Sequence, residues 1–171
     1  FMGYSAGKGG TTSAPYSSGT KNVAVGTYAF DGFTTAEDTT AIGYNAGGSI
    51  TTGVKNVTVG VYSGDALTSG ARNVTLGSNT LGAATTANMN IAIGQGAMES
   101  AAASVAFEGA IAIGKDTLTA LNSTDANGTI AIGHQAGKSI TSGQYNTMVG
   151  YLAGNVITTG DKNTLFGYQA G

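Results

Sequence analysis

The sequence predicts an all-β protein, a parallel β-solenoid of about nine turns in which residues 1–171 form a single repeat array. Three observations predict this fold: a short motif recurs along the chain, most copies are 17 residues apart, and each copy has the alternating pattern of a strand. With 41% hydrophobic residues and a net charge of -2, the chain is expected to fold rather than to be disordered.

The recurring motif ends in a glycine that follows an apolar residue, here called the anchor glycine. The anchor glycines are Gly3, Gly26, Gly43, Gly60, Gly77, Gly94, Gly114, Gly133, Gly150 and Gly167. Most intervals between them are 17 residues, and three are 23, 20 and 19. Equal intervals indicate one structural unit per copy, so longer turns are expected at 4–25, 95–113 and 115–132. Both ends of the sequence fall inside the motif, which predicts an array truncated at both ends.

The residues before each anchor glycine are expected to form a short strand. The residue directly before the glycine is apolar, and the residue two positions earlier is β-branched in the complete copies. Side chains alternate along a strand, so these two positions share one face. We expect this face to point inward and to form the structural core, with one residue from each copy: Val25, Ile42, Val59, Leu76, Ile93, Ile113, Ile132, Val149 and Phe166.

The residue between those two positions is Ala or Thr in most copies, which indicates a close neighbour. Near the ends of the chain it becomes Phe1, Met148 and Leu165, so the strand is apolar on both faces there. Such a pattern is typical of a strand buried on both sides. Because one solenoid turn supplies only one interior, association with further copies of the chain is expected.

A second, shorter strand is expected in the other half of each turn, where an apolar residue precedes a threonine, as at Ile50-Thr51. Glycines follow at regular places, such as Gly53 after this threonine and Gly47 after the anchor glycine. Both are expected at corners, where a positive φ strains glycine least. A helical fold is not favoured because apolar residues do not recur at i, i+3, i+4 and i+7.

Asparagine occupies the position before the strand in six copies: Asn22, Asn56, Asn73, Asn90, Asn146 and Asn163. Identical amides stacked at strand spacing can hydrogen-bond to one another in a ladder along the axis. The alternative is that asparagine is present because it accepts a turn conformation. Both explanations fit the sequence.

No catalytic residues, metal site or cofactor is expected, and the chain is not predicted to be an enzyme. The single histidine, His134, has no candidate triad or zinc partner and is expected to be solvated. There is no cysteine, and the acidic residues lack calcium-loop spacing. The near-neutral charge predicts no nucleic-acid partner, and the absence of a long apolar run predicts no membrane insertion.

Lys55 and Arg72 are candidates for a receptor or glycan surface. They occupy equivalent positions in consecutive copies, so stacked turns would place them about one strand spacing apart. They could form a basic stripe for anionic glycans, or edge charge that prevents sheet-to-sheet aggregation.

Tyr44, Tyr151 and Tyr168 are further candidates because each directly follows an anchor glycine. Exposed aromatic rings can stack on sugars, or they can pack on neighbouring turns. Adjacent threonines, such as Thr51-Thr52, raise the third alternative of an ice-binding surface. Alternation sends the two side chains to opposite faces, which makes that alternative the least favoured.

The motif Asn90-Ile-Ala-Ile-Gly94 resembles the head-domain repeats of trimeric autotransporter adhesins. The form Asn163-Thr-Leu-Phe-Gly-Tyr-Gln-Ala-Gly171, with Thr159-Gly160 before it, is even more similar to the tandem repeats of phage and giant-virus tail-fibre proteins. The resemblance covers essentially the whole chain. The adhesin repeats are commonly shorter than those here.

The resemblance implies a left-handed β-roll that assembles as a homotrimer. It implies a segment of a virion tail fibre that provides extension and attaches to a host cell-surface glycan or protein. The alternative is the head domain of a bacterial trimeric adhesin, located outside the cell at its surface. An ice-binding β-solenoid is the third expectation.

Overall fold

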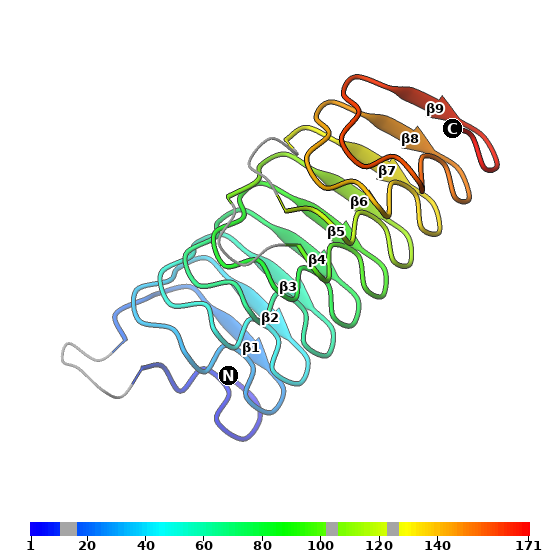
Figure 1. Cartoon of the computed structure of the whole chain (residues 1–171). Helices are drawn as coiled ribbons and strands as arrows, with labels where there is room; N and C mark the ends of the chain where they lie inside the picture. The colour runs from blue at the N-terminus through cyan, green and yellow to red at the C-terminus, as the bar shows by residue number, and fades with distance from the viewer. Residues whose placement is uncertain (11–16, 102–105, 123–126) are drawn as a thin grey trace.

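Within the described residues, nine short parallel strands stack into a rod. The computed structural model describes residues 1–10, 17–101, 106–122 and 127–171. The strands form one sheet in sequence order, and the chain passes through about eight turns, with its two termini at opposite ends of the rod (Figure 1). Their bounds are β1 Val23–Val25, β2 Thr40–Ile42, β3 Val57–Val59, β4 Val74–Leu76, β5 Ile91–Ile93, β6 Ile111–Ile113, β7 Ile130–Ile132, β8 Thr147–Val149 and β9 Thr164–Phe166. The predicted all-β parallel solenoid is confirmed, with about eight turns instead of about nine.

Equivalent residues of successive copies lie directly beside one another. Val25 pairs with Ile42, and Ile93 pairs with Ile113 although the interval there is longer. The insertions are therefore accommodated outside the strand. The turns at 4–25, 95–113 and 115–132 rejoin the common register, and parts of them, at 11–16, 102–105 and 123–126, lie outside the described residues.

The strands face the opposite way from the sequence prediction. In each of β1 to β8 the middle residue is buried, and both flanking residues are half-buried or exposed. Ile42 is 39% exposed and Phe166 is 82% exposed. The prediction of an inward-facing core was therefore wrong for its whole set: Val25, Ile42, Val59, Leu76, Ile93, Ile113, Ile132, Val149 and Phe166 lie on the outer side of the sheet.

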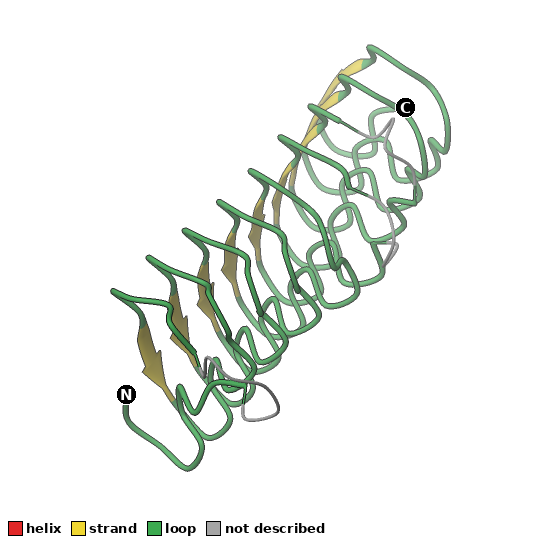
Figure 2. Ribbon diagram, turned by 90° about the vertical axis from the view of Figure 1, so that its left-hand side faces the viewer, coloured by secondary structure: helices red, strands yellow, loops and turns green. Residues whose placement is uncertain are grey.

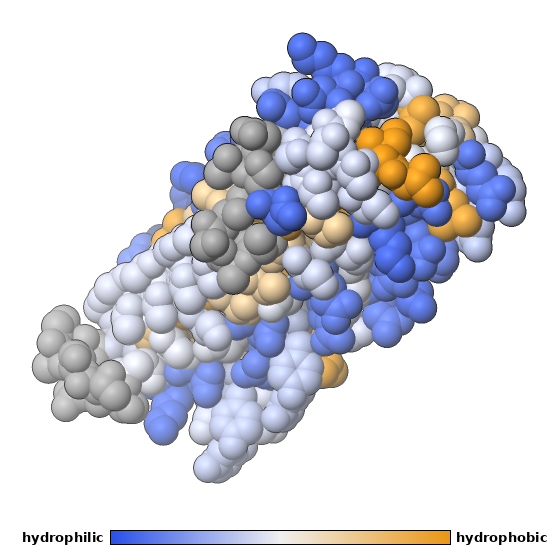
Figure 3. Space-filling view, in the orientation of Figure 1, coloured by the Kyte–Doolittle hydropathy of each residue, from blue (hydrophilic) through white to orange (hydrophobic). Residues whose placement is uncertain are grey.

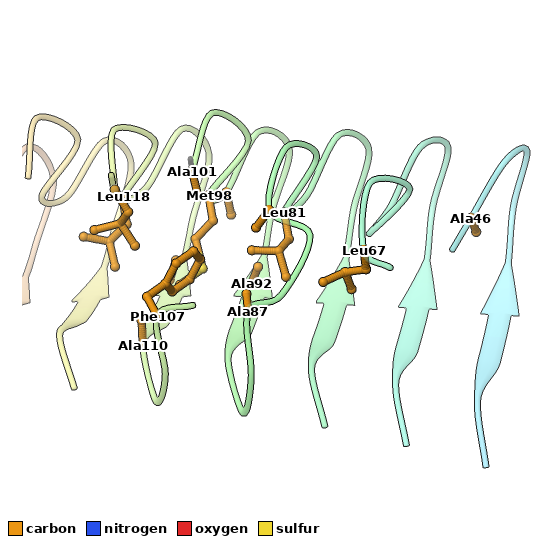
Figure 4. Packing of buried hydrophobic residues seen from close by; sticks show 14 of the residues in the cluster. Ala46, Leu67, Leu81, Ala87, Ala92, Met98, Ala101, Phe107, Ala110 and Leu118 are labelled. Atoms are coloured by element: carbon orange, nitrogen blue, oxygen red, sulfur yellow. The ribbon is translucent and has the colours of Figure 1, made fainter. Parts of the chain in front are cut away.

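The interior has little room at the strand because other parts of the turn fill it. Buried side chains come from the positions four and seven residues after the anchor glycine, such as Leu81 and Leu67 (Figure 4). Their sizes are complementary. In one turn these two positions are Gly47 and Ile50, and in another they are Leu81 and Ala84, so a small residue is paired with a large one in both turns. Since each turn already supplies one or two large side chains, mostly small middle residues such as Ala41 fit beside them.

The other half of each turn contains no strand within the described residues, so the predicted second strand was wrong. Figure 2 shows strands along one side of the rod only. Opposite them, the backbone amides of Thr51, Thr52 and Gly53 all donate to the carbonyl oxygen of Thr68, at 2.9, 3.1 and 3.2 Å. Three successive amides that converge on one oxygen curve the chain, so this half is a stack of hydrogen-bonded turns.

The glycines have two different reasons to be small. Gly47 has φ +57° at a corner, as predicted. Gly53 does not have a positive φ, and a Cβ there would collide with the carbonyl oxygen of Gly70 in the next turn. The anchor glycine Gly43 combines both features, because its φ is +134° and a Cβ would collide with the Gly60 carbonyl.

Candidate functional site

The asparagines form the predicted ladder. Asn73 Nδ2 donates to Asn56 Oδ1 at 3.1 Å and to the carbonyl oxygen of Ala87 at 2.8 Å, and the backbone amide of Asn73 also donates to Asn56 Oδ1 at 2.9 Å. The same Nδ2 to Oδ1 bond joins Asn90 to Asn73 at 3.2 Å and Asn163 to Asn146 at 2.9 Å. Each amide thus ties its own strand to the next turn.

Other residues continue the ladder where asparagine is missing. Thr39 receives a bond from the backbone amide of Asn56 at 3.4 Å, and Thr129 Oγ1 donates to the Gly143 carbonyl at 3.1 Å. Ala110 has no polar side chain, but its backbone amide donates to Asn90 Oδ1 at 2.9 Å. Because these groups satisfy one another inside the rod, the ladder is structural and offers no open amide to a ligand.

The outer side of the sheet is a continuous apolar face, here called the strand face. It consists of two files: the residues directly before the anchor glycines, named above, and the file of Val23, Thr40, Val57, Val74, Ile91, Ile111, Ile130, Thr147 and Thr164. Neither file contains a charged residue. Nine strands, each three residues long, give a face of about 400 Å² that is roughly 40 Å long. A patch of this size is comparable to the largest apolar patch of a typical soluble monomer, and such patches are often functional.

The residues at the position of Lys55 and Arg72 in each turn form a column, here called the basic column. It flanks the strand face on the side where each strand begins. Lys55 and Arg72 are both exposed and have φ of 60° and 61°. The same column also contains Asp38, whose Oδ1 lies 3.8 Å from Nζ of Lys21 in an exposed ion pair. The stripe is therefore limited to two adjacent cations, because Met89 takes the next position.

Tyrosines flank the strand face on the other side, and near the N-terminus they form a continuous file. Tyr4, Tyr28, Tyr44 and Tyr62 have ring centroids 5.6, 6.0 and 5.3 Å apart, with interplanar angles of 88°, 84° and 80°. A hydrogen bond with Tyr44 raises the pKa of the Tyr62 phenol. Tyr44 was expected here, whereas Tyr28 and Tyr62 join the file because their positions, one residue further along, reach the same edge.

A second aromatic file lies near the C-terminus. Tyr151 stacks on Tyr168, with centroids 5.4 Å apart and planes 7° apart. His134 stacks on Tyr151 at 5.1 Å and 10°. His134 is half-buried, so the expectation that it is solvated holds only for part of its ring. Its Nδ1 is buried and has no hydrogen-bond partner among the described residues. The three side chains occupy the same position in successive turns, which explains why their planes are nearly parallel.

A surface hollow of about 310 Å³ adjoins the first aromatic file. Its walls are Tyr62, Asp65, Asn79, Gly82 and Glu99. Burial raises the pKa of Asp65, and hydrogen bonds from the backbone of Asp65 and Ala66 and from the side chain of Asn45 oppose the shift. The sequence reasoning missed this hollow. The 17-residue spacing of Asp65, Gly82 and Glu99, with a glycine between two acids, is the signal that could have found it.

The rest of the described surface offers little chemistry. Among the residues that the structure describes, no group of three or more His, Asp or Glu side chains could hold a metal ion. Within the same ranges, no helix has the length and apolarity to cross a bilayer. The face seen in Figure 3 is mainly hydrophilic, and its hydrophobic colour gathers toward the C-terminal end. No protein family, curated protein or solved structure matches the chain.

Proposed function

We propose that this chain is a structural and adhesive segment of a viral tail fibre, built as a homotrimer of left-handed β-rolls that extends the fibre and attaches to a host surface. The strand face is the observation that carries the proposal. It runs the whole length of the rod, contains two uncharged files of mainly apolar residues, with threonine at Thr40, Thr147 and Thr164, and is not covered by the rest of the chain.

Further copies of the same chain are the partners that fit this face. The face has a ridge at every strand, so a partner must repeat at the strand spacing of about 4.8 Å to match it along its full length. A second copy has that period by construction. Closed symmetry around one axis lets every copy bury the same face, and removal of its exposed apolar side chains from water stabilises the assembly.

The attachment role is assigned to the two edges of the strand face. The tyrosine files, which include Tyr44, Tyr151 and Tyr168, expose aromatic rings that can stack on sugars of the host surface. Lys55 and Arg72 offer a smaller basic patch to anionic glycans. A host cell-surface protein is the other partner that such edges can bind.

The mass of the assembly in solution tests the structural part of the proposal. We expect light scattering to give about 50 kDa, three times the 16.8 kDa of one chain. The double variant Ile91→Asp, Ile111→Asp places charges on the strand face and is expected to be monomeric. Its matched control is Ile91→Thr, Ile111→Thr, which should remain trimeric because Thr40 and Thr147 already occupy this file. A monomeric native chain, or a trimeric aspartate variant, would contradict the proposal.

The head of a bacterial trimeric adhesin would use the same face in the same way. The sequence on either side of this segment in its gene separates the two, because a membrane-anchor domain belongs to the adhesin. An ice-binding role is the third alternative. Against this role, the hydroxyl groups of Thr51 and Thr68 already donate to carbonyls of the next turn, at 3.1 and 3.2 Å. A thermal-hysteresis measurement would test the ice-binding alternative directly.

A further inference from the structure

The hollow beside Tyr62 exists because a file of side chains is interrupted. Asp65, Gly82 and Glu99 occupy the same position in three successive turns. Gly82 has no side chain, so a gap opens between the carboxylates of Asp65 and Glu99. A Cβ at Gly82 would meet only ordinary contacts, the nearest being the Glu99 carbonyl at 3.5 Å, the Asn79 carbonyl at 3.7 Å and Asp65 Oδ1 at 3.8 Å. The glycine is therefore not required by the backbone at this position.

An aromatic ring borders the gap on one side. Tyr62 is the last member of its file, because the equivalent residue in the next turn is Asn79. Both of these residues line the hollow. Tyr44 packs against Tyr62 from the other side in an edge-to-face contact, with ring centroids 5.3 Å apart. A ring fixed in this way loses little side-chain entropy when a ligand stacks on it.

The polar groups of the hollow select the class of ligand. Asp65 and Glu99 carry carboxylates, which accept hydrogen bonds, and the amide of Asn79 both donates and accepts. None of the described residues that line the hollow is a cation. Hydroxyl groups are the donors that such a site can satisfy, whereas sulfate or carboxylate groups would be repelled by the two acids. Burial of Asp65, which raises its pKa, adds to the gain from a donor placed there.

We infer that the hollow formed by Tyr62, Asp65, Asn79, Gly82 and Glu99 is a binding subsite for an uncharged sugar ring. The ring stacks on Tyr62, and its hydroxyl groups donate to Asp65 and Glu99. The volume of about 310 Å³ lies at the small end of ligand sites, which matches one or two sugar units. This inference rests on the proposed adhesive function and narrows it, because it assigns uncharged glycans to this edge and leaves anionic glycans to Lys55 and Arg72.

Binding of defined sugars tests the subsite. The probes are the methyl glycosides of glucose, galactose, mannose and N-acetylglucosamine, followed by saturation-transfer NMR, together with dextran and dextran sulfate as a matched uncharged and anionic pair. We expect at least one uncharged probe to bind the native chain. We expect Tyr62→Ala to weaken that binding by about tenfold. We expect Gly82→Val, which places a side chain in the gap and whose Cβ would meet no contact closer than 3.5 Å, to abolish it.

Several controls separate the subsite from a general change in the protein. Asn155→Val changes the same file position far from the hollow and should leave binding unchanged. Circular dichroism and the mass in solution should be those of the native chain for every variant. Intact trimers that bind no uncharged probe, or binding that survives Gly82→Val, would overturn the subsite and leave the fibre proposal standing. Calcium titration is the last control, because Ca²⁺ binding abolished by Gly82→Val, without any sugar binding, would also overturn it.

Discussion

The interior behind β3 and β4 is lined with hydroxyl groups, whereas the same space behind β8 and β9 holds the apolar side chains of Met148 and Leu165. Ser63 Oγ lies 2.8 Å from Thr75 Oγ1 and 2.9 Å from Thr80 Oγ1, and it donates to the Thr75 carbonyl at 2.9 Å. These groups are fully buried and hydrogen-bond to one another. The polar interior is therefore a connected network.

The apolar interior depends on shape instead of hydrogen bonds. Met148 is fully buried, and glycines in two turns leave room for it. A Cβ at Gly137 would lie 2.7 Å from Met148 Cε, and a Cβ at Gly154 would collide with the Met148 sulfur. A long side chain on the strand is thus matched by a missing side chain at the corners.

Both regions nevertheless have the same backbone. β3 pairs with β4 in the register that β8 uses to pair with β9, and the asparagine ladder runs through each of them. The comparison teaches that backbone hydrogen bonds and the ladder define the turn. The interior chemistry can then vary, provided that its volume is filled and most of its polar groups have partners.

The largest expected effect is on the apolar interior. Met148→Ala removes a buried side chain between corners that have no side chains of their own, so the cavity cannot be filled from them. We expect the free energy of unfolding to fall by about 2–5 kcal/mol, measured by urea denaturation at fixed chain concentration. Val156→Ala is the matched control in the same turn, because Val156 is 69% exposed and its truncation should change stability little. Equal effects of the two variants would contradict the packing described here.

The shared ladder should be equally important in both regions. Asn73→Ala and Asn146→Ala each remove a buried amide that joins two turns. We expect each to lower the free energy of unfolding by about 1–3 kcal/mol, because backbone groups are left without partners. Ser69→Ala, at an exposed hydroxyl, is the control. A large loss in one region with none in the other would show that the ladder does not carry the common backbone.

The hydroxyl network should respond less than the ladder. Ser63→Ala removes the group that joins Thr75 to Thr80, but Thr80 Oγ1 also donates to the Gly77 carbonyl at 3.1 Å. Because these neighbours keep other partners, we expect a loss of about 1 kcal/mol in the same denaturation experiment. Ser49→Ala, in the exposed part of its turn, should have no effect. A Ser63→Ala variant that is more stable than the native chain would indicate that the hydroxyl network destabilises the fold.

The sequence was sufficient for the stacking of the turns but not for the direction of the strands. The period of 17 residues and the six asparagines predicted the register and the ladder, because equivalent residues of a solenoid must lie side by side. Alternation predicted two faces, and the larger residues were assigned to the core by size alone. The prediction did not consider how much of the interior volume is filled by side chains from other parts of the turn. Phe30, Ile50 and Leu81 already occupy the interior from other parts of their turns, so it cannot also hold Ile42 or Leu76.

A candidate site was predictable from the sequence only where all its residues occupy one position of the repeat. Tyr151 and Tyr168 share a column, and the structure stacks them. The hollow combines two columns, since Tyr62 and Asn79 belong to one and Asp65 and Glu99 to another. Their approach depends on how the chain bends between them, which the repeat period does not specify.

An equally small effect gives the sharpest test, because the change in stability is predicted to have opposite signs in adjacent turns. Thr58 and Thr75 are paired neighbours on β3 and β4. Thr58 Oγ1 is buried and has no hydrogen-bond partner in the described part of the chain, whereas Thr75 Oγ1 bonds to Ser63. Valine has nearly the same shape as threonine. Thr58→Val should therefore raise the free energy of unfolding by about 1 kcal/mol, and Thr75→Val should lower it by about the same amount. If both variants shift the urea midpoint in one direction, hydrogen bonding is not what distinguishes the polar interior from the apolar one.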